Sequence, residues 1–223
     1  RVVLLLFLFA LPAHGRVLDS HTDIRVAQSG EVTVTERITL QVDNRQPHSV
    51  LLREVAAPAR VIDVTRNGRP EPWELEAAAS GQRLRIGARG KALPHGRHLY
   101  QIAYSAAGQV RYLDYFDELR WSVPAAERIT AEVSLPASVP ARDMRLSASG
   151  GDYQSFLSDG RAAFRSAKEP MSFAVRFPKG VVAAPAFDYR GLLLVLAGLA
   201  CSAGALVWIR RPWARRSART PAY

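Results

Sequence analysis

Apolar and polar residues alternate along much of this chain, which is the pattern of a β-strand with one buried face. The longest such run is VTVTERITLQV at 32–42, where Val, Ile or Leu fills every second position except Glu36. The same period recurs in ITAEVSL at 129–135 and in MSFAVRF at 171–177. We expect each of these runs to form a half-buried strand.

Shorter runs of the same kind fill much of the chain between them. They lie at 24–27, 50–55, 61–66, 73–76, 84–86, 99–105, 119–123, 144–148, 153–157 and 162–165. Turn pairs such as Asn67-Gly68 and Asp159-Gly160 stand between the runs, and such pairs supply the positive φ of tight hairpins. Short strands at this spacing, without a long amphipathic helix, predict an all-β fold, an antiparallel β-sandwich. The length admits one sandwich or two small sandwiches in tandem.

Two continuous apolar runs lie outside this region. Residues 191–209, GLLLVLAGLACSAGALVWI, hold no charge. At about 1.5 Å per residue they match a hydrocarbon core of about 30 Å, so they predict one transmembrane helix. Residues 2–11, VVLLLFLFAL, are too few to span a membrane and are followed by the small residues Ala13 and Gly15. They predict a secretory signal peptide at 1–15, with an uncleaved anchor as the alternative.

The flanks of the apolar run 191–209 predict its orientation. Five arginines and no acid follow it, in the tail 210–223. Short basic flanks stay in the cytoplasm. We therefore expect a single-pass protein of the cell membrane with an exported domain at 16–177, a stalk at 178–190, and a cytoplasmic tail that lies on the anionic inner leaflet.

The charge balance of the exported part is close to even. The chain carries 30 Lys and Arg against 20 Asp and Glu, but Arg1 and the five tail arginines lie outside 16–190, which leaves 24 basic residues against all 20 acids. This small excess favours a solvated surface of mixed charge, so we expect no nucleic-acid partner. The only cysteine, Cys201, lies in the predicted span. The exported domain must therefore fold without disulfides.

Glu36 interrupts the apolar side of the strand predicted at 32–42. An isolated carboxylate is costly to bury. A β-bulge, or a place at a sheet edge, would turn it to solvent. Otherwise it needs a cation, and Arg53 in the run 50–55 is the nearest in sequence that could pair across strands. Glu36 and Arg53 are therefore a candidate buried ion pair.

The stretch 110–123, VRYLDYFDELRWSV, combines acids with aromatic rings. Its end alternates, so we expect a strand there that buries Trp121. Before that strand stand three acids among three aromatic residues: Asp114, Asp117 and Glu118. Carboxylates in such a setting can serve acid/base chemistry, sugar binding or a cation. The alternative is a turn whose acids cap backbone N–H groups.

No residue cluster amounts to a catalytic or cofactor signature. Of the five histidines, only His95 and His98 are close enough to suggest a metal pair, and no Cys or acidic ligand stands at the usual spacing. No serine has the context of a nucleophile elbow, and no Gly-rich loop leads into a helix. We therefore expect surface histidines, no cofactor, no metal and a non-enzymatic role.

Several motifs follow one another between residues 20 and 177: TDIRVAQSGEVTVTERITL, LLREV, RLRIG, LPHGRHLYQIAYSAAGQV, YFDELRWSV and ITAEVSLP. In this order they resemble the exported domain of the YciQ-like predicted membrane proteins, which are bacterial envelope proteins. The resemblance implies a signal peptide, an exported β-rich domain and then a membrane span. The exported part of that family is classed as a domain of unknown function, so the resemblance implies no activity, cofactor or catalytic residue.

Three functions of different classes stay open. A binding or protein-interaction module, with a protein partner in the envelope, needs only a folded domain with loops on an anchored stalk. A sensor or accessory subunit would act through a membrane partner, because the fourteen residues of the tail are too few to fold alone. A hydrolase would use the acids at 114–118, which lack a second cluster to complete a site. The binding module is the function we expect.

Overall fold

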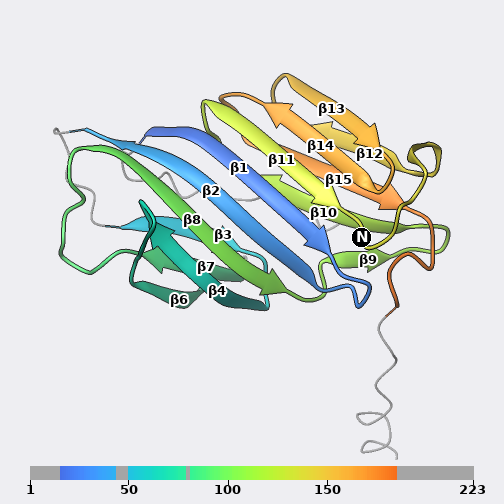
Figure 1. Ribbon diagram of the computed structural model, residues 1–223, viewed down its shortest axis with the longest axis horizontal. Coiled ribbons are helices and arrows are strands. Elements are labelled where there is room, and N and C mark those ends of the chain that lie inside the picture. Colours follow the sequence, from blue (N-terminus) through green and yellow to red (C-terminus); the bar gives the residue numbers. More distant parts are fainter. Residues whose placement is uncertain (1–15, 44–49, 79–80, 185–223) are drawn as a thin grey trace, which may run out of the picture. The chain divides into compact units, whose positions relative to one another are not determined.

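The computed structural model describes residues 16–43, 50–78 and 81–184 (Figure 1). They form an all-β unit that ends at Ala184, and their helical content is one short 3₁₀ turn at Ala141–Asp143. The prediction of an all-β fold with antiparallel sheets is therefore confirmed. Within this described part of the chain, no helix is long and apolar enough to cross a membrane. The predicted signal peptide, the span at 191–209 and the basic tail lie outside the described residues.

The larger layer is an eight-stranded sheet, drawn across the front of Figure 1. Its strands, from one edge to the other, are β13 (Tyr153–Ser158), β14 (Arg161–Ser166), β11 (Arg128–Ser134), β1 (Arg16–Val26), β2 (Val32–Val42), β8 (Gly96–Ala106), β4 (Ala59–Arg66) and β5 (Arg69–Pro70). β2 has the bounds that alternation predicts, and every second residue along it is buried. This pattern arises because one face of the sheet meets the second layer and the other meets solvent.

Two smaller sheets make up the second layer. One contains β12 (Arg145–Ser149), β15 (Met171–Phe177), β10 (Asp117–Val123) and β9 (Val110–Tyr112), and the other contains β3 (Leu51–Val55), β7 (Gly81–Ile86) and β6 (Trp73–Ala78). Phe164 of β14 stacks on Phe173 of β15 with ring centroids 4.3 Å apart, and Glu36 of β2 pairs with Arg53 of β3. Phe164 and Glu36 stand in one cross-strand row of the large sheet. Both smaller sheets therefore cover the same face.

One hydrophobic core fills the space between the layers. Buried side chains from all three sheets belong to a single cluster, and its largest fully buried members include Tyr100, Tyr104, Phe164 and Phe177. The described strands therefore fold as one unit, and they do not form two sandwiches in tandem.

The first strand differs from the sequence expectation in length and in pairing. β1 runs over Arg16–Val26, whereas alternation predicts only 24–27, because the polar residues Ser20 and Thr22 occupy core-facing positions. β1 also pairs in parallel with β11, with Ser20 opposite Ile129, although it is antiparallel to β2. Alternation tells which face of a strand is buried, but it does not tell the direction in which a neighbouring strand runs.

The chain leaves the domain later than the sequence predicts. Residues 178–184, the first part of the stalk predicted at 178–190, are held by the domain: Ala183 donates its N–H to the Gln28 carbonyl at 2.7 Å, and its carbonyl accepts the Tyr112 hydroxyl at 3.0 Å. Gly30 permits this close approach, since its φ is +84° and a Cβ there would stand 2.5 Å from the Tyr112 hydroxyl oxygen. The exit of the chain is therefore fixed beside β9.

Candidate interaction surfaces

The structure separates the acids of the stretch 110–123. Asp114 is exposed in the turn between β9 and β10, whereas Asp117 and Glu118 are the first two residues of β10 and are buried. Successive strand residues point to opposite faces, so Asp117 lies on the core side with the buried Trp121 and Glu118 lies on the outer side. The three carboxylates therefore do not converge on one site, and two of them lie in a strand instead of a capping turn.

Glu118 is surrounded by arginines. Its side chain is 0% exposed. Arg176 Nε donates to Oε2 at 2.7 Å, Arg120 Nε to Oε1 at 2.5 Å, and Arg111 Nη1 to Oε1 at 3.3 Å. Burial by itself raises the pKa of Glu118, but the hydrogen bonds from Arg176 and Arg120 outweigh burial and hold that pKa below its usual value. Glu118 is therefore a permanent counter-ion at neutral pH, and it is unsuited to donate a proton.

Asp117 has its own cation at the end of the same strand. Lys179 Nζ lies 2.7 Å from Asp117 Oδ1 and 5.9 Å from the centre of the Tyr112 ring. Burial and the charge of Asp117 raise the pKa of Tyr112, so the phenol stays protonated and donates to Ala183. These contacts make Asp117 part of the structure that holds the chain exit.

Glu36 and Arg53 meet inside the core, between the two layers. Arg53 Nε donates to Glu36 Oε2 at 2.5 Å, and the Tyr104 hydroxyl donates to Oε1 at 3.1 Å. β2 is a central strand and is regular at this point, where Glu36 stands opposite Thr22 and Ile102, so neither a bulge nor an edge turns the carboxylate outward. Burial, followed by the charge of Glu36, raises the pKa of Tyr104 well above its usual value. Tyr104 therefore remains a donor.

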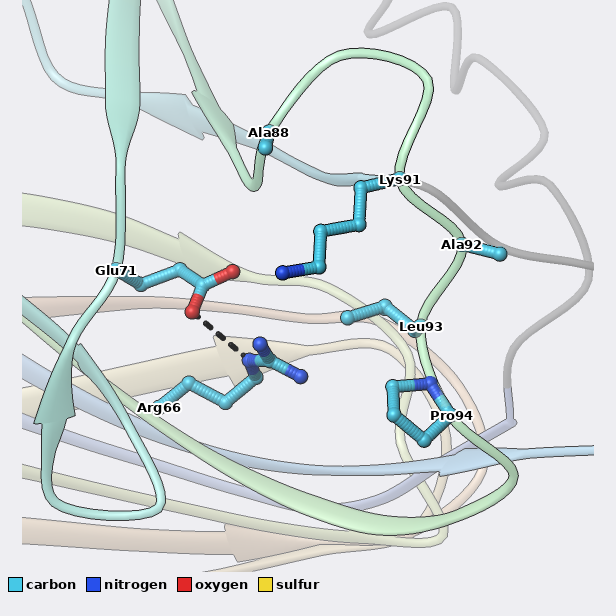
Figure 2. Close-up of a pocket in the computed structure, with 7 residues that line it drawn as sticks. All are labelled: Arg66, Glu71, Ala88, Lys91, Ala92, Leu93 and Pro94. Carbon is cyan, nitrogen blue, oxygen red and sulfur yellow. Dashed lines mark hydrogen bonds and ion pairs between the residues drawn. The ribbon is translucent and has the colours of Figure 1, made fainter.

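A small pocket lies at the end of β4, between β4 and the loop that leads into β8. Its volume is about 180 Å³, and the residues that line it are Arg66, Glu71, Ala88, Lys91, Ala92, Leu93 and Pro94. Figure 2 shows the Lys91 amino group pointing toward Glu71, whose carboxylate already accepts Arg66 Nε at 2.9 Å. Pockets for small-molecule ligands usually exceed about 300 Å³. This pocket is too small for a typical ligand, and its Glu71 carboxylate is already bound by Arg66.

Next to that pocket, Tyr100 stands opposite Arg66 in the pairing of β8 with β4. Its hydroxyl is buried and has no hydrogen-bond partner among the described residues. Burial raises the pKa of Tyr100 to about 12. The group is therefore neutral under all physiological conditions and offers no acid/base function.

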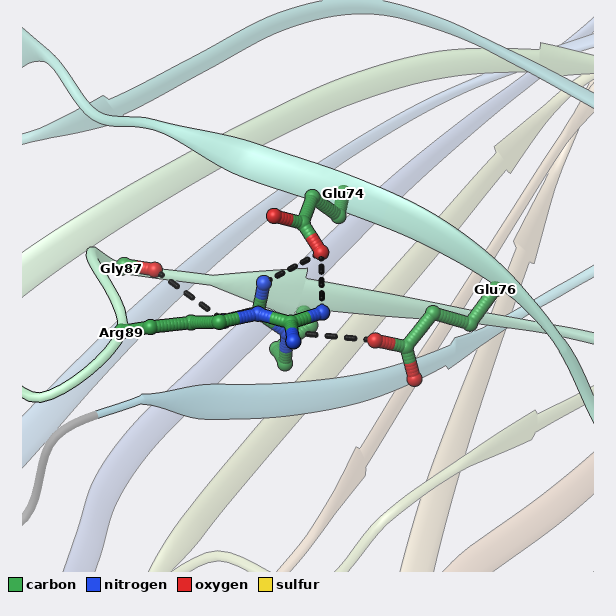
Figure 3. A network of polar contacts seen from close by, with 5 residues as sticks. Glu74, Glu76, Gly87 and Arg89 are labelled. Carbon is green, nitrogen blue, oxygen red and sulfur yellow. Dashed lines mark hydrogen bonds and ion pairs between the residues drawn. The ribbon is translucent and has the colours of Figure 1, made fainter.

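The outer face of β6 and β7 carries a charge network that the sequence reasoning missed. Glu74 and Glu76 of β6 and the Gly87 carbonyl surround Arg85 of β7, and Arg89 reaches Glu74 at 2.8 Å (Figure 3). Hydrogen bonds from Arg85 and Arg89 lower the pKa of Glu74, and the bond to Glu74 raises the pKa of Arg85. The alternation of Glu in one strand with Arg in the next could have predicted these cross-strand pairs.

Metal ligation finds no support in the described part of the chain. There, no group of three His, Cys, Asp or Glu side chains lies close enough together to hold a metal ion. His98 is buried with Nε2 2.7 Å from the Pro94 carbonyl oxygen, and His95 is exposed.

β13 is an edge strand that is exposed along its whole length. All six residues of YQSFLS are exposed, and three of them are large and apolar: Tyr153 at 44%, Phe156 at 48% and Leu157 at 36%. β14 pairs with one side of β13, and no described strand pairs with the other. β13 lacks the charged residues and prolines that commonly protect a sheet edge. The opposite edge, β5, is only two residues long and ends in Pro70.

Comparison with solved structures finds the same fold in parts of larger enzymes. Leukotriene A4 hydrolase from Saccharomyces cerevisiae gives a TM-score of 0.50 at 13% identity, over 73% of this chain and 29% of the hydrolase. The same yeast enzyme in complex with bestatin gives 0.51 at 12% identity, over 72% and 28%. An M1 zinc metallopeptidase from Deinococcus radiodurans gives 0.46 at 15% identity, over 72% and 42%. This chain spans less than a third of the yeast hydrolase, and the likeness to that hydrolase, at this identity, shows the fold alone.

Comparison of sequences assigns the family. No curated protein sequence matches the chain. A family model described as the N-terminal domain of the predicted membrane protein DUF2207 matches residues 16–174, which is nearly the whole described unit. The motifs quoted above, which run from Thr22 to Pro136, lie within this match. The chain therefore belongs to the DUF2207 family of predicted membrane proteins.

Proposed function

We propose that the exported domain is a binding module of the cell envelope, and that β13 accepts an extended segment of a protein partner. The observation that carries this proposal is the open edge of β13, which is uncharged, apolar and six residues long. An added strand would gain main-chain hydrogen bonds along that edge, and alternate side chains would give it specificity.

The side chains of β13 indicate the chemistry of the partner. Tyr153 and Leu157 lie on the same face of the sheet as the core residue Phe164, whereas Phe156 lies on the outer face under the Arg165 guanidinium, 5.2 Å from its ring centre. A strand added to β13 would meet apolar groups on both faces. The partner segment should therefore carry apolar side chains on both sides of an extended backbone.

The other candidate functions have less support. A hydrolase would need a carboxylate free to act on a substrate, but Asp117 is buried and paired with Lys179, and the arginines around Glu118 occupy its carboxylate. A sensor would still need a contact with a membrane partner, and β13 is a surface that could supply it. The binding module therefore requires the fewest features beyond those described.

Photo-crosslinking in intact cells tests this proposal. A benzoylphenylalanine residue in place of Phe156 should crosslink the chain to one envelope protein, within an extended segment identified by mass spectrometry. The substitutions Tyr153→Lys and Leu157→Lys should remove that crosslink, because lysines on an edge strand prevent pairing.

A matched control uses the centre of the same sheet. Thr33 and Gln101 are exposed residues of β2 and β8, far in the strand order from the β13 edge. Thr33→Lys and Gln101→Lys should leave the crosslink from position 156 unchanged. Crosslinks only to a second copy of this chain, no crosslink from position 156, or equal loss in the control variant would each refute the partner proposed for β13.

A further inference from the structure

The outer face of the four-stranded sheet carries one straight row of charged residues across all four strands. Arg145 of β12 stands opposite Arg176 of β15, Arg176 opposite Glu118 of β10, and Glu118 opposite Arg111 of β9. Arg120 lies on the same face, two residues along β10. The strands of this face thus carry four arginines and one glutamate, which leaves three excess positive charges; Glu118 binds three of the arginines, and Arg145 donates to the Arg142 and Met144 carbonyls.

Glu118 fixes three of these arginines in place while their ends stay accessible. The side chains of Arg111, Arg120 and Arg176 are 53%, 58% and 43% exposed. Arg120 and Arg176 bind Glu118 through Nε, and the Arg176 guanidinium also lies 4.9 Å from the centre of the Phe116 ring. Guanidinium groups with unused N–H donors are suited to phosphate oxygens.

Most of the other residues on this outer face have small side chains. The next cross-strand positions hold Ser147, Ala174 and Arg120, and the row after them holds Ser149, Ser172 and Ser122. Ser122 and Ser172 bond to each other at 2.8 Å between hydroxyl oxygens. A broad flat surface can therefore approach the arginines without meeting bulky side chains.

The arginine row lies beside the point where the chain leaves the domain. Arg111 precedes Tyr112, whose hydroxyl holds the carbonyl of Ala183, and Figure 1 shows the described chain ending near β9. Six residues, 185–190, separate Ala184 from the span predicted at 191–209. Even a fully extended chain of six residues reaches only about 22 Å, at about 3.6 Å per residue. If residues 191–209 span a membrane as predicted, a connection of this length limits how far the chain exit can lie from the bilayer.

We propose that the outer face of the four-stranded sheet docks on anionic lipid headgroups of the membrane that anchors the chain. The arginines supply charge complementary to headgroup phosphates, the serines and Ala174 leave the face flat, and the short connection holds the face close to the bilayer. The proposal rests on the predicted span and is independent of β13. Docking would fix the orientation of the domain and leave β13, at the edge of the other layer, for a partner.

Headgroup quenching of a fluorophore on the full chain in lipid nanodiscs tests the proposal. With Cys201→Ser as background, a label at Ser147→Cys reports on the arginine face, and a label at Thr33→Cys reports on the outer face of the eight-stranded sheet. With a headgroup-linked quencher in discs containing phosphatidylglycerol, we expect quenching at position 147 to exceed that at 33 by about twofold or more. It should fall to the level of position 33 in pure phosphatidylcholine, or in about 1 M NaCl.

Charge variants then test whether the arginines of the row cause the quenching at position 147. Arg111→Gln with Arg145→Gln removes two charges while Arg120 and Arg176 still pair with Glu118, and we expect it to lower the quenching at position 147 by about half or more. Arg37→Gln with Arg97→Gln removes the same charge from exposed positions of β2 and β8, and it should have no effect. Circular dichroism checks that each variant folds. The comparison of the two lipids uses the domain with all its arginines, so it does not depend on these variants.

Four results would overturn the proposal. The first is equal quenching at positions 147 and 33, and the second is equal quenching at position 147 in both lipids. The third is the same loss of quenching in both double variants. The fourth is loss of quenching when soluble glycerol phosphate is added, which would indicate a site for small anions. Failure of the chain to enter the discs would overturn the predicted span and the docking face with it.

Discussion

At the residue scale, the buried acids of this domain all act as partners of basic side chains. Glu36 lies in the core, where an unpaired carboxylate would be costly, and Arg53 reaches it from the other layer. Glu118 faces outward but is covered by the arginines that bind it. Each pair joins separate strands, so each makes the fold specific at the point where two elements meet.

We expect Arg53→Met to cost about 3–5 kcal/mol of unfolding free energy, because it leaves the Glu36 carboxylate buried without a cation. The double variant Glu36→Leu with Arg53→Met should cost much less than the sum of the single changes. Tyr104→Phe serves as the control and should cost about 1 kcal/mol, since it removes one hydrogen bond and keeps the ion pair. Denaturant unfolding of the full chain in detergent, followed by circular dichroism, measures Arg53→Met, Glu36→Leu, the double variant and Tyr104→Phe. Small, additive losses would show that the pair contributes little.

Acidification should weaken the domain through Glu118. The folded-state pKa of Glu118 lies below its unfolded value of 4.5, so its contribution is complete above that value and is lost as the pH falls through the folded-state pKa. Glu118→Gln should be less stable by about 1–3 kcal/mol at pH 7 and should lose less stability between about pH 6 and pH 3. Glu132→Gln, at an exposed position of β11, should match the wild type within about 0.5 kcal/mol. Equal acid sensitivity in wild type and Glu118→Gln would contradict this assignment.

At the element scale, β13 and β14 form a hairpin in which only β14 contributes buried side chains to the core. Phe164 of β14 is 1% exposed and stacks on Phe173 across the layers, whereas β13 has no buried residue. The second layer covers β14 and leaves β13 uncovered. β13 therefore contributes little to the hydrophobic core.

Matched phenylalanine substitutions measure that difference. Phe164→Ala should cost about 3–5 kcal/mol, because it leaves a cavity in the core. Phe156→Ala should cost less than about 1 kcal/mol, chiefly by removing the contact with Arg165. Denaturant unfolding gives both values, and hydrogen exchange should show faster exchange in β13 than in β14. A cost for Phe156→Ala close to that for Phe164→Ala would mean that β13 is part of the core.

At the scale of the whole molecule, the arrangement joins a folded β-domain to a predicted span. We expect the domain to be exported and the tail 210–223 to be cytoplasmic, because five arginines follow the apolar run. A reporter that is active only after export should therefore be silent when fused after Arg219. The same reporter fused after Ala184 should be active. Activity of the Arg219 fusion would reverse the orientation.

The sequence by itself determined most of the strands of this domain. Alternation sets which residues of a strand share a face, because successive side chains point to opposite sides whatever the strand pairs with. β2 and β15 consequently begin and end where the pattern predicts. The same period marked Glu36 as an anomaly and made Arg53, the nearest cation in sequence, its candidate partner, because a buried charge needs a cation. The regular pairing of β2 in the structure then excluded the alternatives of a bulge and an edge position.

Only the tertiary structure decided which surfaces these strands build. The row formed by Arg111, Glu118, Arg145 and Arg176 comes from four strands, and its members meet because the registers of three strand pairs place them side by side. The open edge of β13 likewise depends on the strand order, which places β13 last in the large sheet. Register and layering follow from pairings between distant parts of the chain, and a local period of two residues contains no information about them.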